Sequence, residues 1–299
     1  MSVATTDQKV EVVPERAIGA PMRLVISCKD QPGVVAAVST FLFNAGANIV
    51  RSDQFSADPA GGMFFLRMEF TLPPERREGF GEQFGLRVAE RFGMTWRLWD
   101  SANPKRITIF VSRYDHCLHD LLYRWRNNEL GGEVVQVISN WDDLREPVEA
   151  MGLPYHHVPV AKDTKADAEQ RHLELVSDSS DLIVLARYMQ IVSADFIDRV
   201  GVPIINIHHS FLPAFEGAGP YERAKERGVK LVGATAHYVT PELDAGPIIE
   251  QDVVRVTHAH GAYELTRMGA EVERAVLARA VDWHCQDRVI RYGNTTVVF

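Results

Sequence analysis

The sequence predicts an α/β chain with two domains, a small βαββαβ domain followed by a larger domain with a mostly parallel sheet. Three observations lead to this prediction. The chain has 299 residues, which exceeds the usual size of one domain. Strand and helix patterns alternate in its first third. Short, almost continuous apolar runs follow, as expected for a parallel sheet covered by helices on both faces.

The first domain is predicted over residues 22–100, after a polar segment (1–21) that we expect to be a flexible tail. A charged stretch from Glu75 to Phe92 is predicted to be its second helix. The other elements are a strand, a helix, two strands joined by a turn and a closing strand, over MRLVISCKD, GVVAAVSTFLFNAG, ANIVRSDQFSAD, GMFFLRMEF and MTWRLWD. This order predicts a small sheet with both helices on one face.

The second domain is predicted over residues 106–299, after a proline-containing linker at 101–105. Its first five strands are expected to be parallel, over ITIFVS, EVVQVIS, YHHVPV, LIVLAR and PIINIHH. Two further strands follow without an intervening helix and predict an antiparallel extension, over LVGATAHYVT and PIIEQDVVRV. A long amphipathic helix from about Ala262 to Cys285 is expected to pack back on the sheet.

Composition excludes several classes of protein. A formal net charge of −8 disfavours binding to nucleic acid, which needs a basic face. The 3 cysteines form no CxxC pair, which argues against a disulfide framework or a zinc site and favours a reducing compartment. No run approaches the roughly 20 apolar residues that cross a bilayer, and the first residues do not read as a secretory signal. We therefore expect a cytoplasmic protein without membrane or nucleic-acid partners.

The best candidate site lies at the end of the apolar run PIINIHHSFLPAF. On a strand, Asn206 and His208 point to one face, whereas His209 is expected to point away. An amide beside an imidazole can stabilise an oxyanion and carry a proton. Asp244, in the loop PELDAGPII, would be the third member. The pair by itself is more typical of a turn cap or a satisfied polar pair at a strand end than of a catalytic site.

Three strings in order make the pattern specific. LARYMQIV, NIHHSFLPAFEGAGPY and GVKLVGATAHYVTPELDAGPIIEQ resemble the hydrolases and transferases that use 10-formyltetrahydrofolate, which have a Rossmann-like formyltransferase fold. The resemblance implies catalysis by Asn206, His208 and Asp244, without a metal or cofactor. It also implies folate-binding walls at Met189, Gln190, Ile191, Val192, Val239 and Thr240, and a further polar site residue at His237.

The first domain carries a second resemblance. CKDQPGVVAAVSTFLFNAGANI is similar to the ferredoxin-like ACT domains, which bind small amino acids at subunit interfaces. The matching ligand positions are Asp30, Pro32, Gly33 and Asn48. Asp-x-Pro-Gly is also a common turn before a helix, so an amino-acid effector is one of two interpretations. Unpaired sheet edges in such a domain predict a homo-oligomer, a dimer or a tetramer.

The acceptor of the formyl group is expected to be water. The first turn of the second domain, IFVSRYDHCLHDLL, has no glycine, and Arg113, Tyr114 and His116 would crowd a phosphate-binding nest. This turn and the ACT-like domain resemble the formyltetrahydrofolate deformylases. The resemblance implies hydrolysis to formate and tetrahydrofolate, which supplies formate for purine synthesis and balances one-carbon folate pools. Formyl transfer to a small amine and a catalytically silent amino-acid sensor are the alternatives.

The resemblance also allows roles to be assigned. Asn206 and His208 are expected to stabilise the oxyanion, while Asp244 orients His208 and takes a proton from the attacking water. Three residues depart from the deformylase pattern and leave recognition of the substrate tail and the acceptor open: His119, Gly219 and Glu222.

Overall fold

The computed structural model describes residues 20–58, 61–213 and 220–299. The chain divides into two compact units between Asn103 and Pro104. The predicted tail (1–21) lies outside the described residues except for its last two. Lys105, which we expected in the linker, is the first residue of a strand, because its backbone pairs with Gly132 of the neighbouring strand. Its ammonium group lies 2.6 Å from Asp287 Oδ1, and both side chains are buried.

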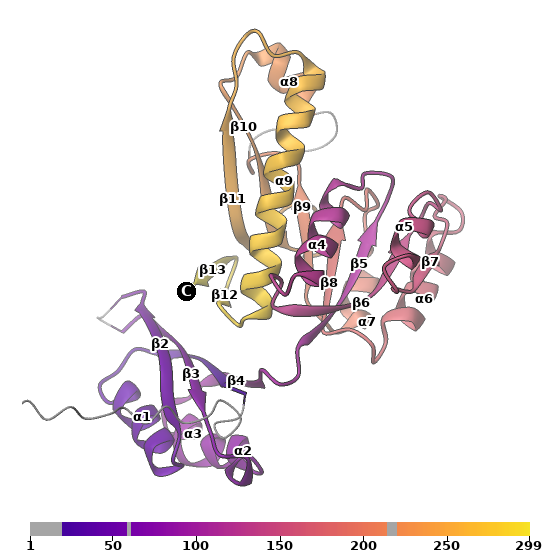
Figure 1. Cartoon of the computed structure of the whole chain (residues 1–299). Coiled ribbons are helices and arrows are strands. Elements are labelled where there is room, and N and C mark those ends of the chain that lie inside the picture. Colours follow the sequence, from indigo (N-terminus) through magenta and orange to yellow (C-terminus); the bar gives the residue numbers. More distant parts are fainter. Residues whose placement is uncertain (1–19, 59–60, 214–219) are drawn as a thin grey trace, which may run out of the picture. The chain divides into compact units, whose positions relative to one another are not determined.

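The first unit is a four-stranded antiparallel sheet in the order β2-β3-β1-β4, so the predicted βαββαβ arrangement is confirmed (Figure 1). The predicted second helix begins later than expected, and a π-helical turn (Gly85–Ala89) joins its two parts. The elements are β1 (Met22–Lys29), α1 (Val34–Asn44), β2 (Asn48–Ser56), β3 (Met63–Thr71), α2 (Phe80–Phe84), α3 (Glu90–Phe92) and β4 (Thr95–Asp100).

One face of this sheet carries the core of the first unit. Alternate residues of the central strand β1, such as Leu24 and Ile26, are fully buried against Val38 and Leu42 of α1. The ring of Phe84, on α2, meets other aromatic rings edge-on there. Strand β2 lies at the sheet edge and is exposed along most of its length, which leaves three large apolar side chains in solvent: Ile49, Val50 and Phe55.

The second unit is built on a seven-stranded sheet in the order β11-β10-β9-β8-β5-β6-β7. Its first five strands are parallel and β10 and β11 are antiparallel, as predicted. The strands are β5 (Lys105–Val111), β6 (Gly132–Ser139), β7 (Tyr155–His157), β8 (Leu182–Ala186), β9 (Ile204–His208), β10 (Leu231–Tyr238) and β11 (Ile248–Arg255). A terminal hairpin follows, with β12 (Val289–Tyr292) and β13 (Thr295–Val298).

Helices cover both faces of the larger sheet. The long helix α9 runs along β9, β10 and β11 and also packs on α4 (Figure 1). Helices α6 and α7 bury a second apolar cluster on the opposite face, with Phe110 and Phe196 at its centre. The helices are α4 (His116–Arg126), α5 (Arg145–Glu149), α6 (Lys165–Val176), α7 (Ala194–Val200), α8 (Pro220–Arg227) and α9 (Ala262–Cys285). None of the described helices is both long and apolar enough to cross a membrane.

The strand pairing brings three sequence motifs together. Strands β8 and β9 are parallel neighbours, so their carboxyl ends meet at one sheet edge. Strand β10 runs back beside β9, which places His237 opposite Asn206 and Thr235 opposite His208. In α/β sheets this edge is where ligands bind.

A buried histidine in the helical layer makes stability depend on pH. His172, on α6, is 1% exposed, and its ring meets Phe110, Tyr188 and Phe196 edge-on. Burial lowers the pKa of His172 to about 4. The unfolded chain therefore binds a proton between about pH 6.5 and 4 that the folded chain does not, so stability falls as pH falls through this window.

We expect His172→Gln to reduce this pH dependence. When the pH is lowered from about 6 to 5, the free energy of unfolding of this variant should fall by about 1 kcal/mol less than that of the unmodified protein. Urea denaturation at both pH values measures the difference. His258→Gln is the control, because His258 is exposed; an equal slope in the two variants would contradict the prediction.

Candidate active site

A cavity of about 450 Å³ lies at the carboxyl ends of β8 and β9. It is bounded by the segment after β8, the end of β9, the end of β10 and the loop that follows β10. Every residue expected to form the catalytic and folate-binding site lines it: Met189, Gln190, Ile191, Val192, Asn206, His208, His237, Val239, Thr240 and Asp244. Motifs separated by more than fifty positions thus meet in one place.

The carboxylate of Asp244 lies between two imidazoles. Its Oδ2 is 3.3 Å from His208 Nδ1, and its Oδ1 is 3.7 Å from His237 Nε2. The largest effect comes from His208, which holds the pKa of Asp244 well below its usual value. Asp244 is therefore an anion at neutral pH, and it fixes the orientation of the His208 ring.

A hydrogen-bond chain orients the amide of Asn206. His237 Nδ1 lies 3.0 Å from the carbonyl oxygen of Tyr238, an acceptor, so this nitrogen carries the proton. In the neutral ring His237 Nε2 then accepts a hydrogen bond from Asn206 Nδ2 at 3.2 Å. An amide nitrogen has two N–H groups, so one remains for a ligand in the cavity.

His208 presents an available nitrogen to the cavity. Its side chain is 6% exposed and its Nδ1 faces Asp244, which leaves Nε2 as the other ring nitrogen. Among the described residues Nε2 is buried and has no hydrogen-bond partner. A buried polar atom of this kind usually marks a functional position.

Two loops hold this arrangement by uncommon backbone conformations. Arg187 and Met189, after β8, adopt positive φ angles of 62° and 61°, which are unusual for side chains of this size. Asp244 also lies in the left-handed region, with φ 55°. Two residues later, Gly246 passes so close to β10 that a Cβ there would lie 1.8 Å from the Tyr238 carbonyl oxygen.

The expectation that His209 points away from the site is wrong. His209 lines the same cavity as His208. Strand β9 ends at His208, so the alternation of side chains along a strand no longer applies to the next residue. Burial, and secondarily the charge of Arg187, lowers the pKa of His209 to about 4, which keeps the ring neutral.

Sequence reasoning missed several residues of the cavity wall. Tyr114, Arg187 and Tyr221 line it. Arg187 belongs to the string LARYMQIV, and Tyr114 to the first turn of the second unit. Of the three departures from the deformylase pattern, Glu222 lines the cavity, His119 is exposed with Nε2 3.4 Å from Asp115 Oδ2, and Gly219 lies outside the described residues.

The predicted effector positions are only partly brought together. Asp30, Pro32 and Gly33 form the turn between β1 and α1, where Asp30 accepts a hydrogen bond from Ser56 Oγ at the end of β2. Asn48 begins β2, so the length of that strand, roughly 25 Å, separates it from this turn. Within one chain the four positions do not form a single site.

Comparisons with known proteins identify the family of each unit. Residues 105–281 match the family model of the formyl transferases, and residues 22–77 match that of the ACT domain. Over 279 residues the chain is 57% identical to the formyltetrahydrofolate deformylase of Mycobacterium tuberculosis, covering 93% of this chain and 90% of the relative. The chain belongs to the formyltetrahydrofolate deformylase family. The deformylase of Bacillus subtilis is 53% identical, with 93% of both chains covered.

Solved structures support the same membership. A formyltetrahydrofolate deformylase from Pseudomonas syringae superposes with a TM-score of 0.90 at 48% identity, covering 94% of this chain and 95% of the other. Glycinamide ribonucleotide transformylase 1 from Symbiobacterium toebii reaches a TM-score of 0.62 at 29% identity and covers 66% of this chain and 94% of its own. The deformylase family therefore shares a fold with transformylases that use another acceptor.

We expect Gly246→Ala to disturb the position of Asp244. The new Cβ would collide with the Tyr238 carbonyl, so the loop must move, which should lower stability by about 1–3 kcal/mol and turnover by about tenfold or more. Thermal denaturation and steady-state kinetics measure the two effects. Gly261→Ala is the control, because its Cβ would have only Glu264 Oε2 nearby, at 3.9 Å. Equal kinetics for both variants would contradict the proposed constraint.

Proposed function

We propose that the chain hydrolyses 10-formyltetrahydrofolate to formate and tetrahydrofolate. Membership of the deformylase family supports this activity. The observation that carries the mechanism is the convergence of Asn206, His208 and Asp244 on one cavity. The flanking walls at 189–192 and 239–240 are the proposed folate-binding surfaces. No step below needs a metal or a cofactor.

Asn206 stabilises the charge that develops on the formyl oxygen. Its second amide N–H is available, because the first is donated to His237. As water attacks the formyl carbon, the carbonyl oxygen becomes an oxyanion, and a fixed donor at this atom contributes roughly 3–4 kcal/mol. The tetrahedral intermediate then breaks its C–N bond and releases formate.

His208 carries the proton from the water to the departing nitrogen. Its Nε2 is the unpartnered ring nitrogen in the cavity, and its Nδ1 is held by Asp244. The strongly lowered pKa of Asp244 makes this carboxylate a weak base. Our expectation that Asp244 itself takes the proton is therefore revised: Asp244 orients His208 and stabilises the imidazolium, as in other carboxylate–histidine pairs.

Water is the acceptor that this cavity favours. Tyr114, from the first turn of the second unit, lines the cavity, and His116 is engaged by Glu273 at 2.7 Å. An amine acceptor that carries a phosphate would need accessible backbone N–H groups in this turn to bind the phosphate, and bulky side chains occupy that place. Formyl transfer to a small amine remains the second candidate, and a silent amino-acid sensor is disfavoured by the assembled catalytic trio.

We expect formate to be released from 10-formyltetrahydrofolate when no acceptor is added. Asp244→Asn and His208→Ala should each lower turnover by about a hundredfold or more, because the first loses the charge that holds the base and the second loses the base. Tetrahydrofolate formation followed spectroscopically, together with a formate assay, measures both. Circular dichroism checks that the variants are folded.

Asp252→Asn is the matched control, since Asp252 is an exposed residue of β11 that pairs with Arg279. It should retain nearly full activity. If the unmodified protein released negligible formate without an acceptor, the result would favour the transferase. If it showed no turnover under any condition, the result would favour the amino-acid sensor. A near-normal rate in either site variant would remove that residue from the mechanism.

The ACT domain supports two further proposals. We propose that it binds an amino-acid effector at an interface between two chains, because Asn48 and the turn at 30–33 are far apart in one chain. We also propose a homo-oligomer, a dimer or a tetramer, that forms through the exposed edge of β2.

Placement in the cytoplasm is supported by three free, buried cysteines.

We expect Val50→Lys to weaken self-association of the full chain. Val50 is 60% exposed on the edge strand β2, and a charge there opposes pairing with a second edge. Light scattering should show a smaller particle than for the unmodified protein at the same concentration. Glu90→Lys introduces the same side chain at an exposed position of α3 and should leave the particle size unchanged. Equal sizes for all three proteins would exclude this edge from the interface.

A further inference from the structure

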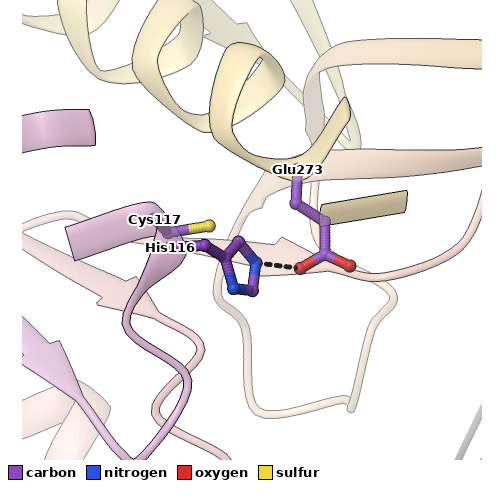
Figure 2. A group of neighbouring side chains, drawn as sticks. All are labelled: His116, Cys117 and Glu273. Carbon is purple, nitrogen blue, oxygen red and sulfur yellow. Dashed lines mark hydrogen bonds and ion pairs between the residues drawn. The ribbon is translucent and has the colours of Figure 1, made fainter. Parts of the chain in front are cut away.

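A buried carboxylate lies behind the wall of the catalytic cavity. Glu273, on α9, has a side chain that is 2% exposed. Its Oε2 is 2.7 Å from His116 Nε2, and its Oε1 accepts a hydrogen bond from the Tyr221 hydroxyl at 2.7 Å (Figure 2 shows the His116 contact). Burial favours the neutral acid, but His116 and Arg187 outweigh it and lower the pKa of Glu273 to about 2. The carboxylate is therefore charged.

This cluster has the spacing of a metal site but not its chemistry. The ligand atoms of His116, Cys117 and Glu273 lie within 4.8 Å of one another (Figure 2). Both oxygens of Glu273 already have partners, and Arg187 Nε lies 3.5 Å from Oε2, so a cation would compete with a guanidinium. Burial raises the pKa of Cys117, whereas metals bind the thiolate. We interpret the cluster as an ion-pair network.

Arg187 is the cationic member of this network, and like Tyr221 it lines the cavity. It lines the same cavity as Asn206 and His208, although its side chain is only 8% exposed. The guanidinium lies over the ring of Tyr114, with its carbon 4.8 Å from the ring centre. Among the described residues, Nη1 is buried and has no hydrogen-bond partner. Leaving a buried charged donor unsatisfied is costly, so a ligand in the cavity is its natural partner.

The ligand should be a small carboxylate. A guanidinium presents N–H groups in a planar fork that matches a carboxylate. Two sources of carboxylate are available: the formate product and the glutamate tail of the folate. In the proposed reaction formate forms from the formyl carbon, beside Asn206 and His208. Arg187 lines the cavity together with His209 and Tyr221, whose ring centres are 6.1 Å apart, and the ring of His209 lies 5.3 Å from that of His208. This placement favours formate.

We propose that Arg187 is a binding residue for the formate product, with Glu273, His116 and Tyr221 as the positioning residues that hold its guanidinium. The inference rests on the proposed hydrolysis, since formate is the product of that reaction. Gly269 supports the arrangement, because any Cβ at this position of α9 would lie 1.9 Å from the Tyr221 hydroxyl. The bare backbone there lets Tyr221 reach Glu273.

Binding of ¹³C-formate to the full-length protein saturated with tetrahydrofolate tests the proposal without turnover. In the unmodified protein, formate should bind saturably, observed as line broadening by NMR. Arg187→Met should weaken binding at least tenfold, and Arg187→Lys, which keeps the charge but loses the fork, by severalfold. Arg199→Met is the control, because Arg199 is half exposed on α7 and pairs with Asp195 outside the cavity. Unchanged formate binding in both Arg187 variants would overturn the proposal.

A second measurement separates the two sources of carboxylate. The affinities of tetrahydrofolate and of tetrahydropteroate, which lacks the glutamate, are compared in the unmodified protein and in Arg187→Met. The proposal predicts that the ratio of these two affinities is the same in both proteins. If Arg187→Met removed the preference for tetrahydrofolate, Arg187 would bind the glutamate tail, and the proposal would be overturned. The proposed function fails separately, by an absence of formate release, whatever the result for formate binding.

The positioning role of Glu273 has its own readout. Glu273→Gln keeps an oxygen for the Tyr221 hydroxyl but removes the charge that holds Arg187. Formate binding should weaken severalfold while the melting temperature shows the variant folded. Stronger formate binding would instead mean that Glu273 only neutralises the guanidinium, which would overturn the positioning part of the proposal.

Discussion

The contact between the Asp244 carboxylate and two imidazoles is the interaction on which the rest of the site depends. It requires β10 to lie beside β9, so that His237 and Asn206 are paired, and it requires the following loop to turn back over the strand ends. The left-handed backbone at Asp244 and the close passage of Gly246 bring the carboxylate to this position. The catalytic geometry is thus a property of strand register and one tight loop, rather than of any single side chain.

Charged groups at this site form two separate clusters, each built around one carboxylate. Asp244 stands against His208 and His237, and Glu273 stands against Arg187 and His116. In each cluster a fully or partly buried carboxylate keeps its negative charge because a cationic or proton-donating partner offsets the cost of leaving water. The protein can therefore hold a proton carrier and a fixed positive charge on one small cavity.

Much of this could be read from the sequence, for physical reasons that differ from residue to residue. Apolar runs report strand type directly, so the order of parallel and antiparallel strands was predictable. Asn206 and His208 share a face because strands alternate, but His209 lies beyond the strand end, where that rule stops. Glu273 contacts His116 across 157 positions, and nothing in a helical charge pattern reveals a partner at that distance.

The two sides of the cavity come from different stretches of the chain. The groups proposed to act on the formyl carbon belong to β9, β10 and their loop, whereas other parts of the lining come from the first turn, from Arg187 and from the long C-terminal helix. Sequence changes in the first turn, at Arg187 and in the C-terminal helix alone could replace water by another nucleophile. The residues proposed to act on the formyl group of the folate would then stay the same. A transformylase of known structure shares the scaffold of the second unit at 29% identity, so the same sheet supports a protein named for a different acceptor.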